Sequence, residues 1–187
     1  MSLRPSYPIE TKRLMLRPIE ASDLDAMHAI QSDPEISRYL YWEPRSRSEV
    51  EEFIASSSAS LEKEGDKLRL AVVLRESGDV IGDVVLVWSS SEHQQGEIGF
   101  IFNPDHQGKG YATEAAVELL RFGFEGVKLH RIVGRCDDRN VASTRVMEHL
   151  GMRREAHLRE NEFVKGEWQG EIVYAMLASE WIGSVND

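Results

Sequence analysis

Length, composition and charge exclude several classes of protein. The chain has 187 residues, enough for one domain, and its 41% hydrophobic content predicts a single buried core instead of a disordered or fibrous chain. Its 32 acidic residues exceed its 22 basic ones, so the formal charge is −10, which argues against binding to nucleic acid or to an anionic membrane.

The predicted elements follow from hydrophobic periodicity. In chain order they are a strand over 12–17, a short helix over 24–31, a helix from Ser46 to Gly65, strands over 68–75, 80–88 and 96–102, a helix over 111–125, a strand over 131–136, a helix over 140–150, and strands over 154–164 and 168–177. Turn residues join the second and third strands, and the last two, as hairpins. The strand–helix–strand order over 96–136 implies a parallel pair. The pattern predicts an α/β fold with one mixed, mostly antiparallel sheet of about seven strands and helices on both faces.

Cellular location is predicted from three sequence features. The one cysteine, Cys136, cannot form an internal disulfide. Residues 1–30 contain no basic segment followed by an apolar one, as a secretion signal would. No apolar run approaches the roughly 18 residues of a spanning helix. We therefore expect a cytoplasmic protein that does not enter membranes.

The segment from Phe100 to Glu114 is a strand, a glycine-containing turn and a helix start. The first N–H groups of a helix have no partners within the helix and carry partial positive charge. Gly108 and Gly110 let the backbone approach an oxygen-rich ligand without a Cβ in the way. The segment predicts a cradle for a phosphate or pyrophosphate, with a structural turn as the alternative.

Two familiar phosphate-binding loops do not fit this segment. A Walker A loop needs Gly at Asn103 and a hydroxyl residue at Gly110, directly after Lys109. A dinucleotide-binding loop that begins at Gly108 needs Gly or Ala where Thr113 stands.

The remaining pattern, Gln107-x-x-Gly110-x-Ala112 directly after a strand, resembles the GCN5-related N-acetyltransferases. Downstream, Asn140-x-x-Ser143 followed by Leu-Gly-Met resembles the RimJ/RimL-like branch, which acetylates ribosomal-protein N-termini. The resemblance covers residues 9–181, and we expect one domain over 1–187 with that core.

The resemblance implies acetyl-coenzyme A (acetyl-CoA) as the acyl donor and no metal. Its pyrophosphate would lie on the backbone N–H groups of 108–113, and its pantetheine in a cleft where the strand ending at Phe102 splays from strand 131–136. Backbone groups of 100–102 would polarise the thioester carbonyl. The expected acetyl-CoA contacts are Phe100, Ile101, Phe102, Gln107, Gly108, Lys109, Gly110, Tyr111, Ala112, Thr113, Asn140 and Ser143.

Three residues are candidates for proton transfer. Glu97, on the strand before the loop, is the first candidate base, with a capping or ion-paired carboxylate as the alternative. Glu162 lies 19 residues after Ser143, a spacing that resembles the RimL-like enzymes, but it also fits a solvated charge. Many enzymes of the superfamily protonate the thiolate with a Tyr where this chain has Met147. Ser143 is the replacement that the resemblance suggests, and an ordinary first-turn serine is the alternative.

The acceptor pocket is predicted at the aromatic and acidic cluster of Tyr41, Trp42 and Glu43, for which core packing is the alternative. The expected partners are acetyl-CoA and an amine, attacked directly in a ternary complex, with a homodimer left open. The resemblance suggests a protein N-terminal amine as acceptor. A small amine, an antibiotic and a non-catalytic acyl-CoA-binding module stay open as alternatives.

Overall fold

The computed structural model describes residues 2–185; residues 1, 186 and 187 of the predicted domain lie outside the described part. An eight-stranded mixed sheet has the order β1-β2-β3-β4-β5-β6-β8-β7. The strands are β1 (Ile9–Glu10), β2 (Leu14–Pro18), β3 (Lys67–Leu74), β4 (Val80–Ser90), β5 (Gln95–Phe102), β6 (Arg131–Asp137), β7 (Arg153–Val164) and β8 (Glu167–Leu177). The strand beyond the expected seven is β1, whose two residues are too few to produce a periodic pattern.

The sheet opens between β5 and β6. These strands form the predicted parallel pair, whereas the neighbouring pairs β4–β5 and β6–β8 are antiparallel. The register joins Gln95–Ile98 to Arg131–Gly134 and goes no further. The second half of β5 and the end of β6 therefore separate, which confirms the predicted splay. Their facing backbone groups are left without strand partners in this pair, so a ligand can bind them.

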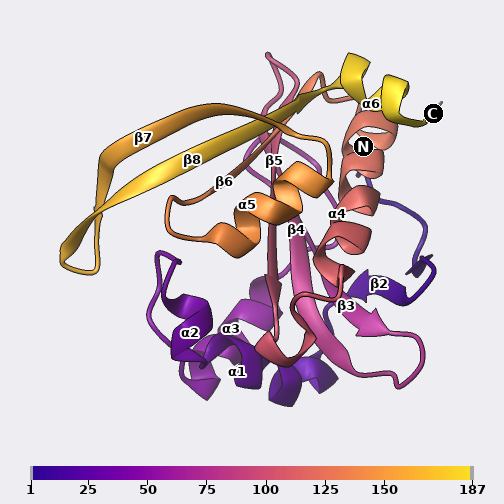
Figure 1. The fold of residues 1–187 in the computed structure, drawn as a ribbon. Helices are drawn as coiled ribbons and strands as arrows, with labels where there is room; N and C mark the ends of the chain where they lie inside the picture. Colours follow the sequence, from indigo (N-terminus) through magenta and orange to yellow (C-terminus); the bar gives the residue numbers. More distant parts are fainter. Residues whose placement is uncertain (1, 186–187) are drawn as a thin grey trace.

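Helices cover both faces of the sheet (Figure 1). They are α1 (Leu24–Gln31), α2 (Pro34–Ser37), α3 (Arg47–Ser56), α4 (Tyr111–Arg121), α5 (Val141–His149) and α6 (Ala178–Val185), with short turns η1 (Ala21–Asp23), η2 (Pro104–His106) and the π-helical η3 (Phe122–Gly126). On one face, α1 and α3 pack on β3 through Met27, Val50 and Ala71. On the other, α4 and α5 cover the larger core, and Leu119 and Met147 belong to it.

One predicted helix ends earlier than expected, because it was predicted to reach Gly65 and α3 ends at Ser56. The Ser56 and Ser57 hydroxyls donate hydrogen bonds to the Phe53 carbonyl at 3.1 and 2.8 Å, which favours the end of the helix. The predicted helix over 111–125 is α4 followed by the π-helical turn η3. Neither α2 nor α6 was predicted.

Strands β7 and β8 form the predicted hairpin, which reaches away from the body of the protein (Figure 1). Lys165 and Gly166 make its turn with φ angles of 51° and 83°, the left-handed values that a tight hairpin turn requires. Across residues 2–185, no helix is both long and apolar enough to span a bilayer.

Candidate active site

A cavity of about 1030 Å³ lies where β5 and β6 separate. It is walled by β5, by the first turns of α4 and α5, by the β7–β8 hairpin and by the segment that follows α1. Most of the predicted site residues line it: Tyr41, Trp42, Glu97, Phe100, Ile101, Phe102, Gln107, Gly108, Gly110, Tyr111, Ala112, Thr113, Asn140, Ser143 and Glu162. Lys109 and Glu43 do not.

The start of α4 has the geometry of an anion cradle. Gly108 and Gly110 have φ angles of 71° and 79°, which other residues adopt at a cost. An added Cβ on Gly110 would lie 3.4 Å from a guanidinium nitrogen of Arg13. Arg13, directly before β2, supports the loop: its Nη1 donates to the Lys109 carbonyl at 2.8 Å, and its Nε pairs with Glu114 at 2.6 Å. The first N–H groups of α4 therefore face the cavity on a supported loop, and these residues fit a pyrophosphate.

Two predicted cofactor contacts in this loop have other partners for their side chains. The Lys109 ammonium donates to the Asp105 carbonyl at 2.8 Å, so the Lys109 side chain points toward η2. The Gln107 amide donates to the Phe102 carbonyl at 2.9 Å and ties the loop to β5. Gln107 can contact a ligand from the cavity wall, whereas Lys109 supports the loop.

The first turn of α5 forms the opposite wall. Asn140 is the N-cap, as predicted, because its Oδ1 accepts the Ser143 N–H at 3.1 Å. The Ser143 hydroxyl has no hydrogen bond among the described residues and lies at the cavity. Met147 is 1% exposed, and its sulfur is so close to Gly134 that a Cβ there would lie 2.6 Å from it. Met147 has no proton to donate, whereas the Ser143 hydroxyl can donate one to a ligand in the cavity.

Glu97 lines the cavity, and Arg135 lies between its carboxylate and that of Glu171. Arg135 Nε is 3.4 Å from the Glu97 carboxylate, and its Nη1 is 3.2 Å from that of Glu171. Burial raises the pKa of Glu97 above the ordinary value and the charge of Glu171 adds to the rise, while Arg135 opposes both. A carboxylate with a raised pKa is a stronger base, so the position suits proton abstraction.

The rim of the cavity pairs an aromatic residue with a carboxylate. Glu162 on β7 is partly buried, and Tyr41 lies opposite on the segment after α2. Partial burial of the Tyr41 hydroxyl raises its pKa, and the carboxylate of Glu162 raises it further. Tyr41 therefore stays neutral and can donate a hydrogen bond to Glu162.

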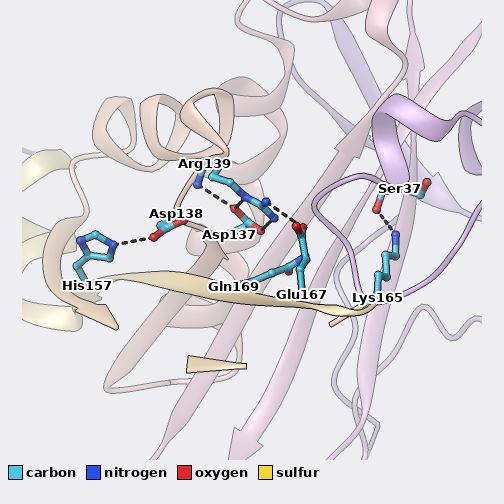
Figure 2. Close-up of polar contacts among 8 residues, drawn as sticks. All are labelled: Ser37, Asp137, Asp138, Arg139, His157, Lys165, Glu167 and Gln169. Carbon is cyan, nitrogen blue, oxygen red and sulfur yellow. Dashed lines mark hydrogen bonds and ion pairs between the residues drawn. The ribbon is translucent and has the colours of Figure 1, made fainter. Parts of the chain in front are cut away.

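A set of polar contacts fixes the hairpin over this rim (Figure 2). Lys165, at the hairpin turn, donates to the Ser37 carbonyl at 2.7 Å. Arg139 joins Asp137 on β6, at 2.7 Å, to Glu167 on β8, at 2.9 Å. Glu43, predicted to bind substrate, is 73% exposed and its carboxylate lies 3.7 Å from Lys165. Glu43 is therefore beside the hairpin turn and outside the cavity wall, and its contact with substrate stays a prediction.

Removing the Lys165 contact tests whether the hairpin shapes the acceptor pocket. In Lys165→Ala, we expect the KM for the amine to rise several-fold, because the turn is no longer tied to Ser37. Stability should fall by about 1 kcal/mol or less, as for other partly exposed contacts. Steady-state kinetics and thermal melting measure both. Lys63→Ala, at an exposed position outside the cavity, is the control, and an equal change in both variants would contradict the tethering role.

Other polar residues have no apparent role in transfer. Burial and the Asp137 carboxylate raise the pKa of the Cys136 thiol to about 12, which disfavours the thiolate that a nucleophile needs. His106 lines the cavity, with its ring 6.4 Å from that of Tyr111. Among residues 2–185, no group of three or more His, Cys, Asp or Glu side chains is placed to hold a metal ion.

Sequence reasoning missed Arg13, Arg135 and Glu171. Arg135 and Glu171 are ordinary charged residues on strands, and Arg13 directly precedes β2. Only contacts between distant segments bring them to the site. A weak signal existed for Arg135. It lies two residues after Val133, so the two side chains are on the same face of β6, and Val133 is the residue that pairs with Glu97.

Comparison with known proteins identifies the class that this fold and cavity define. The acetyltransferase (GNAT) domain model matches residues 13–153, and the chain belongs to this family. It is 36% identical to the uncharacterized N-acetyltransferase YnaD of Bacillus subtilis, over 92% of this chain and 98% of the relative. The protein is therefore an acetyl-CoA-dependent N-acetyltransferase.

Two solved structures are similar along nearly their whole length. An acetyltransferase of the GNAT family from Bacillus anthracis has a TM-score of 0.84 and 34% identity, and covers 92% of this chain and 99% of its own. A spermidine N-acetyltransferase from Vibrio cholerae, solved with CoA and spermine, has a TM-score of 0.77 and 28% identity, with the same coverage. These relatives support the family; they do not confirm the RimJ/RimL-like branch.

Proposed function

We propose that this enzyme acetylates a small primary amine by direct attack within a ternary complex. The observation that carries the proposal is the single cavity that joins the α4 cradle to Glu97. Acetyl-CoA supplies a thioester that an amine can attack. The cradle of 108–113 would hold its pyrophosphate. The backbone groups of Gly99–Phe102 that face β6, where the strand pairing has ended, would orient the thioester end.

The amine must lose a proton before or during attack. At neutral pH an alkyl ammonium of pKa about 10.4 costs roughly 4 to 5 kcal/mol to deprotonate, whereas an α-amine of pKa about 7.7 costs roughly 1 kcal/mol. Glu97 would accept this proton, directly or through one water. Glu162 at the rim is the second candidate carboxylate, and with Glu171 it would attract a cationic amine into the cavity.

Ser143 would protonate or hold the departing sulfur. A thiol of pKa about 8.5 is about 2 kcal/mol from release as the thiolate at pH 7, so we expect kcat of Ser143→Ala to fall about 10- to 30-fold at that pH. The loss should fade as the pH rises above the thiol pKa. Steady-state kinetics from pH 6.5 to 9.5 measure this. Thr144→Ala is the control, since its hydroxyl donates to the Val141 carbonyl. A loss that does not change with pH would contradict the role.

The acceptor is tested with a panel of amines. Release of free CoA would be measured with small amines, polyamines and N-terminal peptides, after calorimetry has shown that acetyl-CoA binds. Transfer to at least one small amine is expected. The N-terminal amine of a protein is the second candidate, favoured by the Asn140-x-x-Ser143 pattern, and preference for peptides would support it. Binding without transfer to any amine would contradict the proposal and favour a non-catalytic module. A cytoplasmic location, a homodimer and a single domain over 1–187 stay predictions.

A further inference from the structure

One part of the cavity wall, called the inner pocket below, is formed by Gln31, Arg45, Phe53, Arg69 and Asp83. Asp83 pairs with Ile101 across β4 and β5, and Ile101 lies on the same face of β5 as Glu97. The inner pocket is therefore on the acceptor side of the sheet. None of its residues was a predicted site residue, and the transfer step described above uses none of them.

Two buried polar atoms in the inner pocket have no partner in the described part of the chain. They are Nε2 of Gln31 and Oδ2 of Asp83, and each residue is 1% exposed. The orientation of the Gln31 amide is fixed, because Arg45 Nη1 donates to its Oε1 at 2.6 Å and a guanidinium only donates. Buried polar groups are nearly always hydrogen-bonded, so a free donor and a free acceptor at a cavity wall point to a ligand.

The inner pocket also holds one positive charge without a carboxylate partner. Arg69 is paired with Asp83 at 2.6 Å. Arg45 has only the neutral Gln31 amide, and no carboxylate of residues 2–185 lies within 4.0 Å of it. Its guanidinium lies 4.5 Å from the Trp42 ring and 5.1 Å from the Phe53 ring, which limits its movement. Burial and the neighbouring Arg69 lower the pKa of Arg45, and the charges of Asp83 and Glu49 oppose this change only in part.

We propose that the inner pocket binds a carboxylate of the acceptor, so that the substrate is an amino acid or another amine that carries a carboxylate. Arg45 and the Gln31 NH₂ would donate to the carboxylate, and Asp83 Oδ2 would accept an N–H or O–H beside it. One unpaired positive charge matches a singly charged carboxylate better than a doubly charged phosphate. A polyamine would instead place a second cation beside Arg45 and Arg69. The inference rests on the proposed function and names its substrate class.

The test compares acids with their neutral counterparts at saturating acetyl-CoA. The probes are common L-amino acids, their carboxamides, glycyl dipeptides and spermidine, each assayed with the wild type, Arg45→Gln and Arg47→Gln. Arg47 is the matched control, a charge on α3 that pairs with Asp25 outside the cavity. We expect kcat/KM to be about 10- to 100-fold higher for acids than for carboxamides, as for a hydrogen bond to a charged group. Arg45→Gln should remove this preference and Arg47→Gln should keep it. The carboxylate can come from a free amino acid or from the C-terminus of a short peptide. Comparing amino acids with glycyl dipeptides shows which of the two is preferred.

The remaining outcomes separate this inference from the proposed function. Transfer to spermidine or carboxamides as fast as to acids, unchanged in Arg45→Gln, overturns the inference while acetyl transfer stands. If no amine is acetylated, the same acids are titrated by calorimetry into the protein with CoA bound. Binding lost in Arg45→Gln then supports the inner pocket, and no binding of any acid overturns it. An unchanged affinity for acetyl-CoA shows that Arg45→Gln is folded.

Discussion

Gly110→Glu is expected to lower the affinity for acetyl-CoA by more than 100-fold and leave the chain folded. Gly110 is the N-cap of α4 with φ 79°, and Arg13 Nη2 would lie 3.4 Å from an added Cβ. A carboxylate at this position would repel the pyrophosphate, which the N–H groups at the start of α4 are proposed to bind. The left-handed backbone adds a strain of about 1 to 2 kcal/mol. Calorimetry with acetyl-CoA and thermal melting separate the two effects.

Gly78→Glu is a matched control for the strain. Gly78 has φ 80° in the turn between β3 and β4, where an added Cβ meets no atom within 4 Å. The two variants share the backbone strain and the added charge, and only one lies at the cradle. Equal melting temperatures with a large difference in affinity are expected. If Gly110→Glu binds acetyl-CoA as tightly as Gly78→Glu does, the loop is not the cradle.

The acetyl-CoA half of the site could be predicted because its signals are local. Gly108 and Gly110 need left-handed backbone within three residues of each other, and Asn140 caps the helix that presents Ser143. Such features depend on a short segment and its own backbone, so the sequence pattern carries them. The direction of the Lys109 side chain could not be predicted in this way, since its ammonium donates to the Asp105 carbonyl in η2.

The acceptor half could not be predicted in the same way. The polar residues that were missed come from α1, from the segment before α3 and from β3, β4, β6 and β8, and each is ordinary in its own segment. Arg69 and Asp83 become a pair only through the β3–β4 hairpin, and Arg135 meets Glu171 only through the β6–β8 register. The sequence-based choice of Glu43 was made from its aromatic neighbours. In the structure its carboxylate lies near Lys165, a residue distant in sequence, and outside the cavity wall.

Net charge is a further case in which the local arrangement matters more than composition. The balance of −10 suggests a protein that repels a strongly anionic cofactor. The cradle instead uses backbone N–H groups and one helix terminus, and Arg13 supports it from behind. Within residues 2–185, six acidic residues line the cavity: Glu35, Asp83, Glu97, Asp137, Glu162 and Glu171. None of them belongs to the loop over 108–113, so the net charge is no argument against an anionic donor there.

Glu97→Gln is expected to lower kcat/KM about 100-fold or more without destabilising the fold. A general base contributes roughly 10²- to 10⁴-fold, and Gln has the same shape but cannot accept the proton. The pKa of Glu97 is higher in the folded state than in the unfolded state. Protonated Glu97 therefore favours the folded state, and this contribution is complete below the unfolded-state pKa. It is lost as the pH rises through the folded-state pKa. At pH 7 the ionised carboxylate is thus disfavoured by its surroundings, and the melting temperature of Glu97→Gln should equal or exceed that of the wild type.

The pH profile separates a base from a structural carboxylate. In the wild type, kcat/KM should fall as the pH drops through the raised pKa of Glu97, because the protonated form accepts no proton. This acid limb should vanish in Glu97→Gln, while the limb set by the pKa of the amine remains. Glu76→Gln, in the exposed turn before β4, is the control for the charge change. An acid limb that persists in Glu97→Gln would assign the base to another carboxylate, and Glu162→Gln would then be measured in the same way. A lower melting temperature with near-normal kcat/KM would instead show that Glu97 acts only through its ion pair with Arg135.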